Sequence, residues 1–365
     1  KTTTVTKILA LLLEQQPDLR IFLAAPTGKA AVRLTISINK QLDGLKRHID
    51  TAIIEKLPRV ASTIHRLLGW KPHGFDHNKD NPLPCDCLLL DESSMVDQGL
   101  MASLLSALPK DCRIILLGDR DQLSSVEAGS VLGDLTGHGK TLTLSAERAN
   151  VLKMLIGELP TDIVDNKTPA IADHIAQLSY SYRFASGGGI GRLAYAVNHG
   201  DTNSIESMLK ESSDELKWME SKGQQLDTSV INWAVDHYRT IFDATTESEA
   251  LKAFESSRVL TALRNGPWGE STIRERIETK LEKEGLISVR SNAPYKGLPV
   301  IICKNDRETG LFNGDTGIFW PDENNELMAW FEIKEMLTPF SVHQLPEWKP
   351  AWTLTVHRSQ GSEYN

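Results

Sequence analysis

Two neighbouring acids are the first residues of this sequence whose type and position could do chemistry. Asp91 and Glu92 directly follow an apolar run at residues 87–90, which predicts a strand. An aspartate at the carboxyl end of a strand can hold Mg²⁺, while the adjacent glutamate orients and deprotonates an attacking water. The same pair is also typical of an aspartate that caps the following helix, with the glutamate in its first turn. The two residues alone leave both interpretations open.

A second polar segment follows the next apolar run along the chain. Residues 113–117 are apolar after their first residue, Asp119 comes directly after Gly118, and Gln122 follows three residues later. The side-chain amide of Gln122 could hydrogen-bond a γ-phosphate oxygen or an attacking water, because it carries both donors and an acceptor. The alternative is an ordinary polar turn. Asp119 and Gln122 therefore join the acids as candidates.

The first two residues look like the end of a phosphate loop of the form G-x-x-x-x-G-K-[ST]. In such a loop Lys1 would reach the β- and γ-phosphates, and the Thr2 hydroxyl would hold Mg²⁺. The glycines would lie before the given sequence, so we expect this chain to be a piece of a longer protein. The Gly28-Lys29 pair is not a second such loop, because Leu23 occupies the first glycine position and Ala30 has no hydroxyl.

The elements that must position these residues are predicted by continuous apolar runs at residues 20–25, 87–91 and 113–118. Such runs suit parallel strands that are covered on both faces, and helical patterns lie between them. They predict a doubly wound α/β domain over about residues 1–150, with a small insertion at about 44–84. Ligands of such domains bind at the carboxyl ends of the strands. Residues 150–290 are predicted to be mainly helical, with apolar spacing around 171–178, 193–197 and 273–281.

The segment at residues 294–345 has a different pattern. Short β runs at 299–303, 316–320 and 327–333 are separated by Asn313-Gly314 and by residues 321–325, which are hairpin and turn signals. These runs predict a small antiparallel barrel or meander, inserted into the surrounding domain. Residues 352–356 then return to a buried strand.

The composition excludes several classes of protein. With 365 residues, 40% hydrophobic and 24% charged, the chain is neither disordered nor a fibrous repeat. No apolar run approaches the ~18 residues of a membrane span. The net charge of −8 argues against a histone-like coat on nucleic acid but leaves room for a locally basic channel. Four cysteines are too few for a disulfide scaffold, so a reducing, cytoplasmic location is expected.

The order of these motifs along the chain is more specific than any one of them. In sequence they resemble the motifs of superfamily 1 helicases, and several stretches are closer still to the alpha subunits of bacterial exodeoxyribonuclease V, the RecD family. The resemblance runs across the whole chain and rests on residues 1–2, 23–31, 62–69, 91–92, 117–129, 181–184, 310–315 and 355–363.

This resemblance implies a fold and a nucleotide site. The fold would be α/β, with two RecA-like P-loop NTPase domains and a small SH3-like β-barrel insertion in the second. The second domain would comprise residues 151–293 and 346–365, and the insertion residues 294–345. ATP and Mg²⁺ would be the cofactors, and an arginine reaching the γ-phosphate can be worth ~10³–10⁵ in rate. The implied catalytic residues are Glu92, Gln122 and Arg183; the nucleotide-binding residues Lys1, Thr2, Asp119, Gly361 and Glu363; and the metal ligands Thr2 and Asp91.

The resemblance also implies a track for single-stranded DNA. Hydroxyls and imidazoles suit this task because they hydrogen-bond phosphates without selecting a base sequence. For His65 the alternative is a buried histidine on the apolar face of Ile64, Leu67 and Leu68. The residues at the implied DNA positions are Pro26, Thr27, Thr63, His65, Thr355 and His357.

The function that the resemblance implies is that of an ATP-dependent 5′→3′ DNA helicase or translocase. It would act as the alpha subunit of exodeoxyribonuclease V in double-strand-break repair and recombination, with the beta and gamma subunits as partners. Two alternatives stay open: a standalone helicase of the same family, and an inactive subunit that only binds DNA or other proteins.

Overall fold

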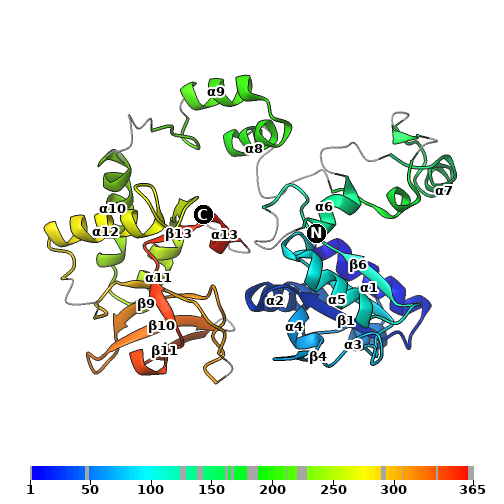
Figure 1. Cartoon of the computed structure of the whole chain (residues 1–365), viewed down its shortest axis with the longest axis horizontal. Coiled ribbons are helices and arrows are strands. Elements are labelled where there is room, and N and C mark those ends of the chain that lie inside the picture. The colour runs from blue at the N-terminus through cyan, green and yellow to red at the C-terminus, as the bar shows by residue number, and fades with distance from the viewer. Residues whose placement is uncertain are drawn as a thin grey trace. The chain divides into compact units, whose positions relative to one another are not determined.

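The structure is a computed structural model, and it forms two compact units (Figure 1). Unit 1 comprises Lys1–Pro26 and Ala30–Trp218, and unit 2 comprises Thr27–Lys29 and Met219–Asn365. The structure describes residues 2–45, 49–123, 129–137, 143–160, 163–165, 168–178, 188–211, 213–219, 228–288, 293–306, 308–333 and 336–360. Among the described helices none is both long enough and apolar enough to cross a membrane.

Unit 1 is built on a four-stranded parallel sheet. The strand order is β2-β1-β5-β6, with every neighbouring pair parallel. All four residues of β5 are buried, as expected for an inner strand that is covered on both faces. The parallel strands predicted from the continuous apolar runs are therefore confirmed. Their bounds are β1 (Ile21–Ala25), β2 (Ser62–Thr63), β5 (Cys87–Leu90) and β6 (Arg113–Leu116).

Helices pack on both faces of this sheet because successive side chains of a strand point to opposite faces. Leu89 joins a core with α1 (Thr2–Gln15), α2 (Gly28–Leu45) and α3 (Thr51–Lys56). Leu88 and Leu90 join a second core, with α4 (Ile64–Leu67) and α5 (Gln98–Ala107). The sheet is thus the middle layer of a three-layer arrangement, as the doubly wound prediction requires.

The other elements of unit 1 are short. The segment at 171–178, predicted as helical, contains only the 3₁₀ helix η3, which ends at His174 and is followed by extended backbone at Ile175. The remaining bounds are β3 (Trp70–Lys71), β4 (Gly74–Phe75), η1 (Ser93–Met95), α6 (Val131–Thr136), α7 (Ala146–Ile156), η3 (Ala170–His174), α8 (Gly189–His199) and α9 (Thr202–Glu211).

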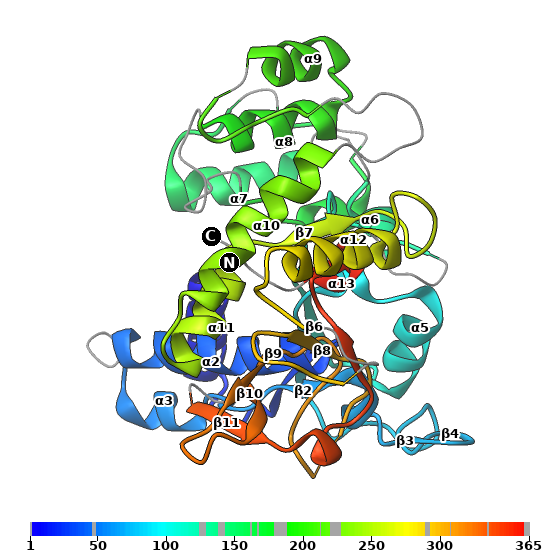
Figure 2. The same cartoon turned by 90° about the vertical axis from the view of Figure 1, so that its left-hand side faces the viewer.

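Unit 2 combines a short parallel pair of strands with an antiparallel sheet (Figure 2). The parallel pair is β7 (Val259–Thr261) with β13 (Thr353–Thr355), and its helices are α10 (Thr228–Phe242), α11 (Glu247–Ser256) and α12 (Glu270–Lys283). The five-stranded sheet has the order β11-β10-β9-β8-β12. Its strands, with the two short helices of this part of the chain, are β8 (Pro299–Ile302), β9 (Thr316–Pro321), β10 (Leu327–Ile333), β11 (Met336–Phe340), η4 (Val342–Gln344), β12 (Trp348–Pro350) and α13 (Val356–Ser359).

The antiparallel sheet is inserted between two strands that pair with each other. β7 precedes it in the chain and β13 follows it, yet Val259 pairs with Thr353 and Thr261 with Thr355. The predicted β runs between residues 299 and 333 are confirmed as β8, β9 and β10. One continuous core, which includes Tyr238, Phe319 and Trp352, joins the helices and the antiparallel sheet.

Candidate functional site

The carboxyl ends of three parallel strands in unit 1 bring the predicted acids to one edge of the sheet. The backbone N–H of Asp91 donates to Ala24 O at 2.9 Å, and Leu117 N–H donates to Leu90 O at 2.8 Å. The ladder thus continues one residue beyond each strand. Asp91, directly after β5, lies between the ends of β1 and β6, and Asp119 follows the end of β6. This edge is where α/β domains bind their ligands.

Asp91 and Glu92 are held at a strained corner of the backbone. Glu92 has a φ of 51°, in the left-handed region, and its N–H donates to Asp91 Oδ1 at 2.9 Å. For a residue other than glycine this conformation costs roughly 1–3 kcal/mol and persists only where the surroundings enforce it. Both side chains are half-buried. Strain of this kind gathers at functional sites, so the corner supports a chemical role for the pair.

The interpretation of Asp91 as a helix cap does not hold. The next element is the 3₁₀ helix η1, whose N-cap residue is Glu92, and within the described residues no side chain caps it. The next α-helix, α5, is capped by Asp97, whose carboxylate accepts from Leu100 N at 2.8 Å. Asp91 is therefore not occupied as a cap.

Ser93 fixes the corner from the other side, and sequence reasoning did not single it out. Its backbone N–H and its hydroxyl both donate to Leu117 O, each at 2.8 Å. This residue ties the acid pair to the end of β6. Gly118 makes the approach possible, because a Cβ there would lie 2.4 Å from Leu132 Cδ2 and 2.9 Å from Ser93 Oγ. A serine after an acid pair and a glycine after a strand are the signals that could have found them.

Asp119 and Gln122 form a compact, exposed turn. Gln122 N–H donates to Asp119 O at 3.3 Å, and Asp121 N–H donates to Asp119 Oδ1 at 3.1 Å. The Gln122 amide lies 3.5 Å from Asp119 Oδ2, which is the limit of a hydrogen bond. The turn therefore holds the Gln122 side chain loosely, where it can rotate toward a ligand at the edge of the sheet.

Thr63 and His65 follow the outer strand β2. Thr63 pairs with Ala25, and its hydroxyl accepts from Arg66 N at 3.2 Å, which caps α4. His65 is exposed, and its ring centroid lies 6.0 Å from that of Phe75. Ile64 and Leu68 fill the buried face instead. The alternative of a buried His65 is therefore wrong. Pro26 and Thr27, both half-buried, connect β1 to α2.

Thr355 and His357 lie at the carboxyl end of β13 in unit 2. Thr355 pairs with Thr261 and is only 4% exposed, whereas His357 is exposed on α13. Of these two, His357 presents the surface that a DNA strand could contact, and Thr355 anchors the turn that carries it.

Part of the predicted nucleotide site lies outside the described residues. Lys1, Arg183, Gly361 and Glu363 are in this group, and of Thr2 only the backbone at the start of α1 is described. In the described ranges no three His, Cys, Asp or Glu side chains gather as a metal site.

The amino ends of the same strands carry structural groups. Arg20 donates to Asp86 through Nε at 2.8 Å and through Nη2 at 2.7 Å, and these bonds lower the pKa of Asp86 to about 2. Burial raises the pKa of Cys87 to about 11 and also raises the pKa of Cys112. These thiols stay protonated at neutral pH, so they are poor nucleophiles.

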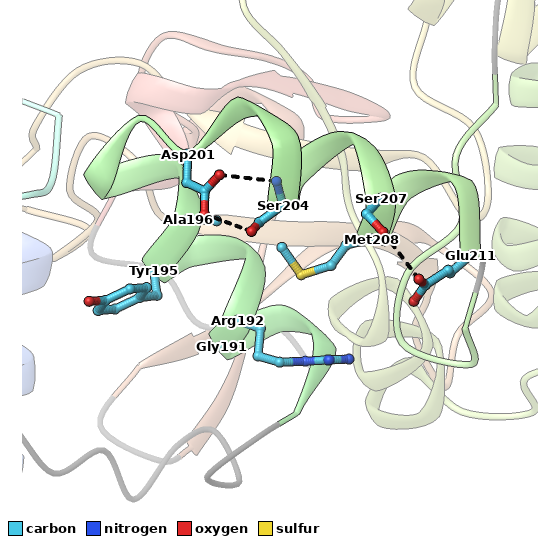
Figure 3. Close-up of a pocket in the computed structure, with 9 residues that line it drawn as sticks. All are labelled: Gly191, Arg192, Tyr195, Ala196, Asp201, Ser204, Ser207, Met208 and Glu211. Atoms are coloured by element: carbon cyan, nitrogen blue, oxygen red, sulfur yellow. Dashed lines mark hydrogen bonds between the residues drawn. The ribbon is translucent and has the colours of Figure 1, made fainter.

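A hollow of about 510 Å³ lies between α8 and α9 (Figure 3). Its polar groups largely bond to one another: Asp201 accepts from Ser204 N–H at 3.1 Å and from Ser204 Oγ at 2.6 Å, and Ser207 Oγ donates to Glu211 at 3.1 Å. Those hydrogen bonds lie within α9 and at its start. No residue predicted for chemistry lines the hollow.

Several known proteins are similar to this chain. Residues 1–128 match the model of an AAA domain family. The whole chain is 35% identical to the RecBCD enzyme subunit RecD of Haemophilus influenzae and covers 59% of it. Over 99% of its length it is 29% identical to the ATP-dependent RecD2 DNA helicase of Deinococcus radiodurans, of which it covers 40%. The chain thus spans less than two thirds of the length of these relatives.

Among solved structures, the Pif1 helicase from Bacteroides in complex with ADP-AlF3 and single-stranded DNA is similar. The match covers 99% of this chain and 79% of that one, at 16% identity and a TM-score of 0.41. A TM-score at this level is too low to decide anything about the present chain.

Proposed function

We propose that this chain, a RecD-like member of the superfamily 1 helicases, is the motor of an ATP-dependent DNA helicase. The observation that carries the proposal is the strained Asp91–Glu92 corner at the carboxyl edge of a parallel sheet. An enzyme that had lost its chemistry would gain stability by relaxing such a corner. The strain therefore argues against the alternative of an inactive subunit.

The proposed fold is a pair of RecA-like P-loop NTPase domains. The first would span about residues 1–150, with an insertion at 44–84, and the second residues 151–293 and 346–365. An SH3-like barrel would occupy residues 294–345. The pairing of β7 with β13 supports an insertion there, because these strands lie on either side of the antiparallel sheet in the chain.

In the proposed nucleotide site each residue has one task. Glu92 accepts the proton of the attacking water, and Gln122 orients that water or a γ-phosphate oxygen. Asp91 and Thr2 would hold Mg²⁺, which would neutralise charge on the phosphates when bound. Lys1, Asp119, Gly361 and Glu363 would bind the nucleotide, and Arg183 would stabilise charge that develops on the γ-phosphate.

In the proposed DNA track the protein contacts the sugar-phosphate backbone of a single strand. The exposed imidazoles of His65 and His357 are the groups best presented for this, and Pro26, Thr27, Thr63 and Thr355 shape the segments that carry them. Contacts to phosphates position a strand without reading its bases, which is what translocation along a strand of any sequence needs. The 5′→3′ direction is proposed from the family resemblance.

The proposed assembly is that of the alpha subunit of an exodeoxyribonuclease V, with beta and gamma partners and a role in double-strand-break repair and recombination. The RecBCD subunit of H. influenzae is more similar to the chain, at 35% identity, than the RecD2 helicase of D. radiodurans, at 29%. This difference favours the subunit, and a standalone helicase is the second candidate.

One experiment tests the proposed function as a whole. The full-length protein is assayed for ATP hydrolysis with and without a single-stranded oligonucleotide, and for displacement of a strand from a duplex with a 5′ single-stranded tail. We expect DNA to stimulate hydrolysis and the tailed duplex to be unwound. A rate of ATP hydrolysis that is the same with and without DNA would contradict the proposal. Unwinding only of a duplex with a 3′ tail would contradict the proposed 5′→3′ direction of movement.

A further inference from the structure

Glu270, a buried acid in unit 2, has no part in the proposed ATP site, yet its carboxylate and its backbone carbonyl bond to the two ends of one short segment. Glu270 is the first residue of α12 and is 8% exposed. Lys349 Nζ donates to Glu270 Oε1, and Thr353 Oγ1 donates to Glu270 O at 2.9 Å. A carboxylate this buried is stable as an anion only with such a partner. Lys349 lies in β12, and Thr353 is the first residue of β13. The start of α12 therefore binds both ends of the crossing, which is the segment 349–353 that connects the antiparallel sheet to the parallel pair.

The crossing is also held by its tryptophan. Trp352 is fully buried, and its Nε1 donates to Tyr295 Oη at 3.0 Å, which in turn donates to Glu278 of α12 at 3.1 Å. The start of β13 is therefore fixed to α12 at two points. The end of β13 is held differently, because among the described residues no side-chain bond caps α13 at Thr355.

β13 connects the segment held by α12 to the turn that carries His357. It has three residues, and two residues beyond it His357 is exposed on α13. All three residues of β13 pair with β7, so the strand keeps one extended geometry from Thr353 to Thr355. The way in which Thr353 is held therefore contributes to where His357 lies.

The surroundings of Lys349 show why the Glu270 carboxylate is needed to hold this lysine against α12. Burial and, to a smaller extent, the guanidinium groups of Arg358 and Arg264 lower the pKa of Lys349 to about 8, and the Lys349 ammonium group donates to the Glu270 carboxylate. Without the carboxylate the Lys349 side chain would lose the acceptor that holds it to α12, whether it kept its proton beside two guanidinium groups or lost it.

We infer that Glu270 is a positioning residue for DNA: its carboxylate holds Lys349, and with it the start of β13, so that His357 meets the strand. This inference rests on the proposed function. It concerns the DNA response alone, because neither Glu270 nor Lys349 is a candidate for the nucleotide site.

A double-mutant cycle tests the inference in the full-length protein. The variants are Glu270→Gln, Lys349→Met, the combination of both, and Lys349→Arg. Each is measured for the oligonucleotide concentration that half-maximally stimulates hydrolysis, for the basal rate without DNA, and for its melting temperature. Arg239→Met is the matched control, because it breaks another ion pair to α12, Arg239–Glu284 at 2.7 Å, near the opposite end of that helix.

We expect the half-stimulating DNA concentration to rise about tenfold in both single variants and by the same factor in the double variant. The effects are expected not to add, because each single change removes the same interaction, the one between Glu270 and Lys349. The basal rate should stay native, and Lys349→Arg and Arg239→Met should respond to DNA as the native protein does. Should Glu270→Gln fail to fold, Lys349→Met alone provides the same test.

Three results would overturn the inference. They are a native DNA response in both single variants, additive defects in the double variant, or a basal rate that falls together with the DNA response. A native protein that hydrolyses ATP without any response to DNA is a different failure, because it overturns the proposed function itself and the inference with it.

Discussion

The Asp91 carboxylate accepts a hydrogen bond of 2.9 Å from the backbone N–H of Glu92, while Glu92 itself has a φ of 51°. The first acid thus stabilises the strained backbone of the second. Ser93 completes the corner with two bonds to Leu117 O. Because three consecutive residues hold this geometry, the Glu92 side chain has a fixed starting point at the edge of the sheet.

Replacing Glu92 by glutamine should abolish DNA-stimulated hydrolysis while nucleotide binding stays close to native. The amide cannot accept the proton of the attacking water, and the loss of a general base costs about 10²–10⁴ in rate. Asp91, the residue proposed to hold Mg²⁺, is unchanged. The measurement pairs a hydrolysis assay with titration of a fluorescent nucleotide. Turnover at the native rate would mean that the pair has been assigned wrongly.

Replacing Glu92 by glycine should separate strain from catalysis. Glycine adopts a φ of 51° without steric cost, so the free energy of unfolding should rise by up to about 1 kcal/mol. Hydrolysis should be lost as in Glu92→Gln. Denaturant titration of the two variants side by side checks this, since Glu92→Gln keeps the strain. If Glu92→Gly were the less stable of the two, the corner would not be strained.

Replacing Gly118 by alanine should destabilise unit 1 and slow hydrolysis. The new Cβ would lie 2.4 Å from Leu132 Cδ2 and 2.9 Å from Ser93 Oγ, so the Ser93 turn must shift. Overpacking of this kind costs typically about 1–3 kcal/mol. Thermal unfolding and the hydrolysis rate are both measured. Adding Leu132→Ala makes room for the methyl group and should restore part of the stability, while a double variant no better than Gly118→Ala would locate the strain elsewhere.

The loss of folding stability at acidic pH should depend on the ion pair between Arg20 and Asp86. Hydrogen bonds from Arg20 lower the pKa of Asp86 from 3.8 to about 2. A carboxyl group whose pKa is depressed in the folded state stabilises it above the unfolded pKa, and this contribution is lost as pH falls through the folded pKa. Arg20→Met should therefore reduce the loss of stability between about pH 4 and pH 2. Melting temperatures at pH 7 and pH 3 measure it, and an identical pH dependence in both proteins would contradict the prediction.

The sequence predicted the strands whose apolar runs are continuous, and missed what depends on distant partners. The runs at 87–91 and 113–118 indicated parallel strands because burial on both faces requires apolar residues at every position. β7 was not predicted, since its three residues become a strand only by pairing with β13, which lies 94 positions further along the chain. A pattern so short carries no period of its own.

The candidate site was predicted in the same uneven way. Residue types and motif order pointed to Asp91, Glu92 and Gln122, but no local pattern predicts the left-handed backbone of Glu92, because it is imposed by bonds to a neighbouring strand. The contact of Glu270 with Lys349 joins residues 79 positions apart. The spacing of neighbouring residues cannot predict a contact between positions so far apart in the sequence.

The last prediction concerns the proposed DNA track. It tests the proposed binding of DNA separately from the hydrolysis of ATP. With a net charge of −8 the chain repels nucleic acid as a whole, so the proposed binding would have to come from local contacts, for which His65 and His357 are the proposed residues. Both imidazoles are exposed, and both lie away from the acid pair in the chain. Combining His65→Ala with His357→Ala should weaken binding of single-stranded DNA at least about tenfold, because a hydrogen bond to a charged group contributes roughly 1.5–3 kcal/mol.

The loss should be similar for oligonucleotides of different sequence, since contacts to phosphates carry no base information. Affinity of the native protein should fall linearly with salt on logarithmic axes, because binding to phosphates releases counterions. Fluorescence anisotropy at several salt concentrations measures both, with His199→Ala, an exposed histidine of α8, as the control. DNA stimulation of hydrolysis should drop more than the basal rate. Equal affinity for single strands and blunt duplex, unchanged in the double variant, would remove the track and leave a nucleotide-binding protein with no assigned target.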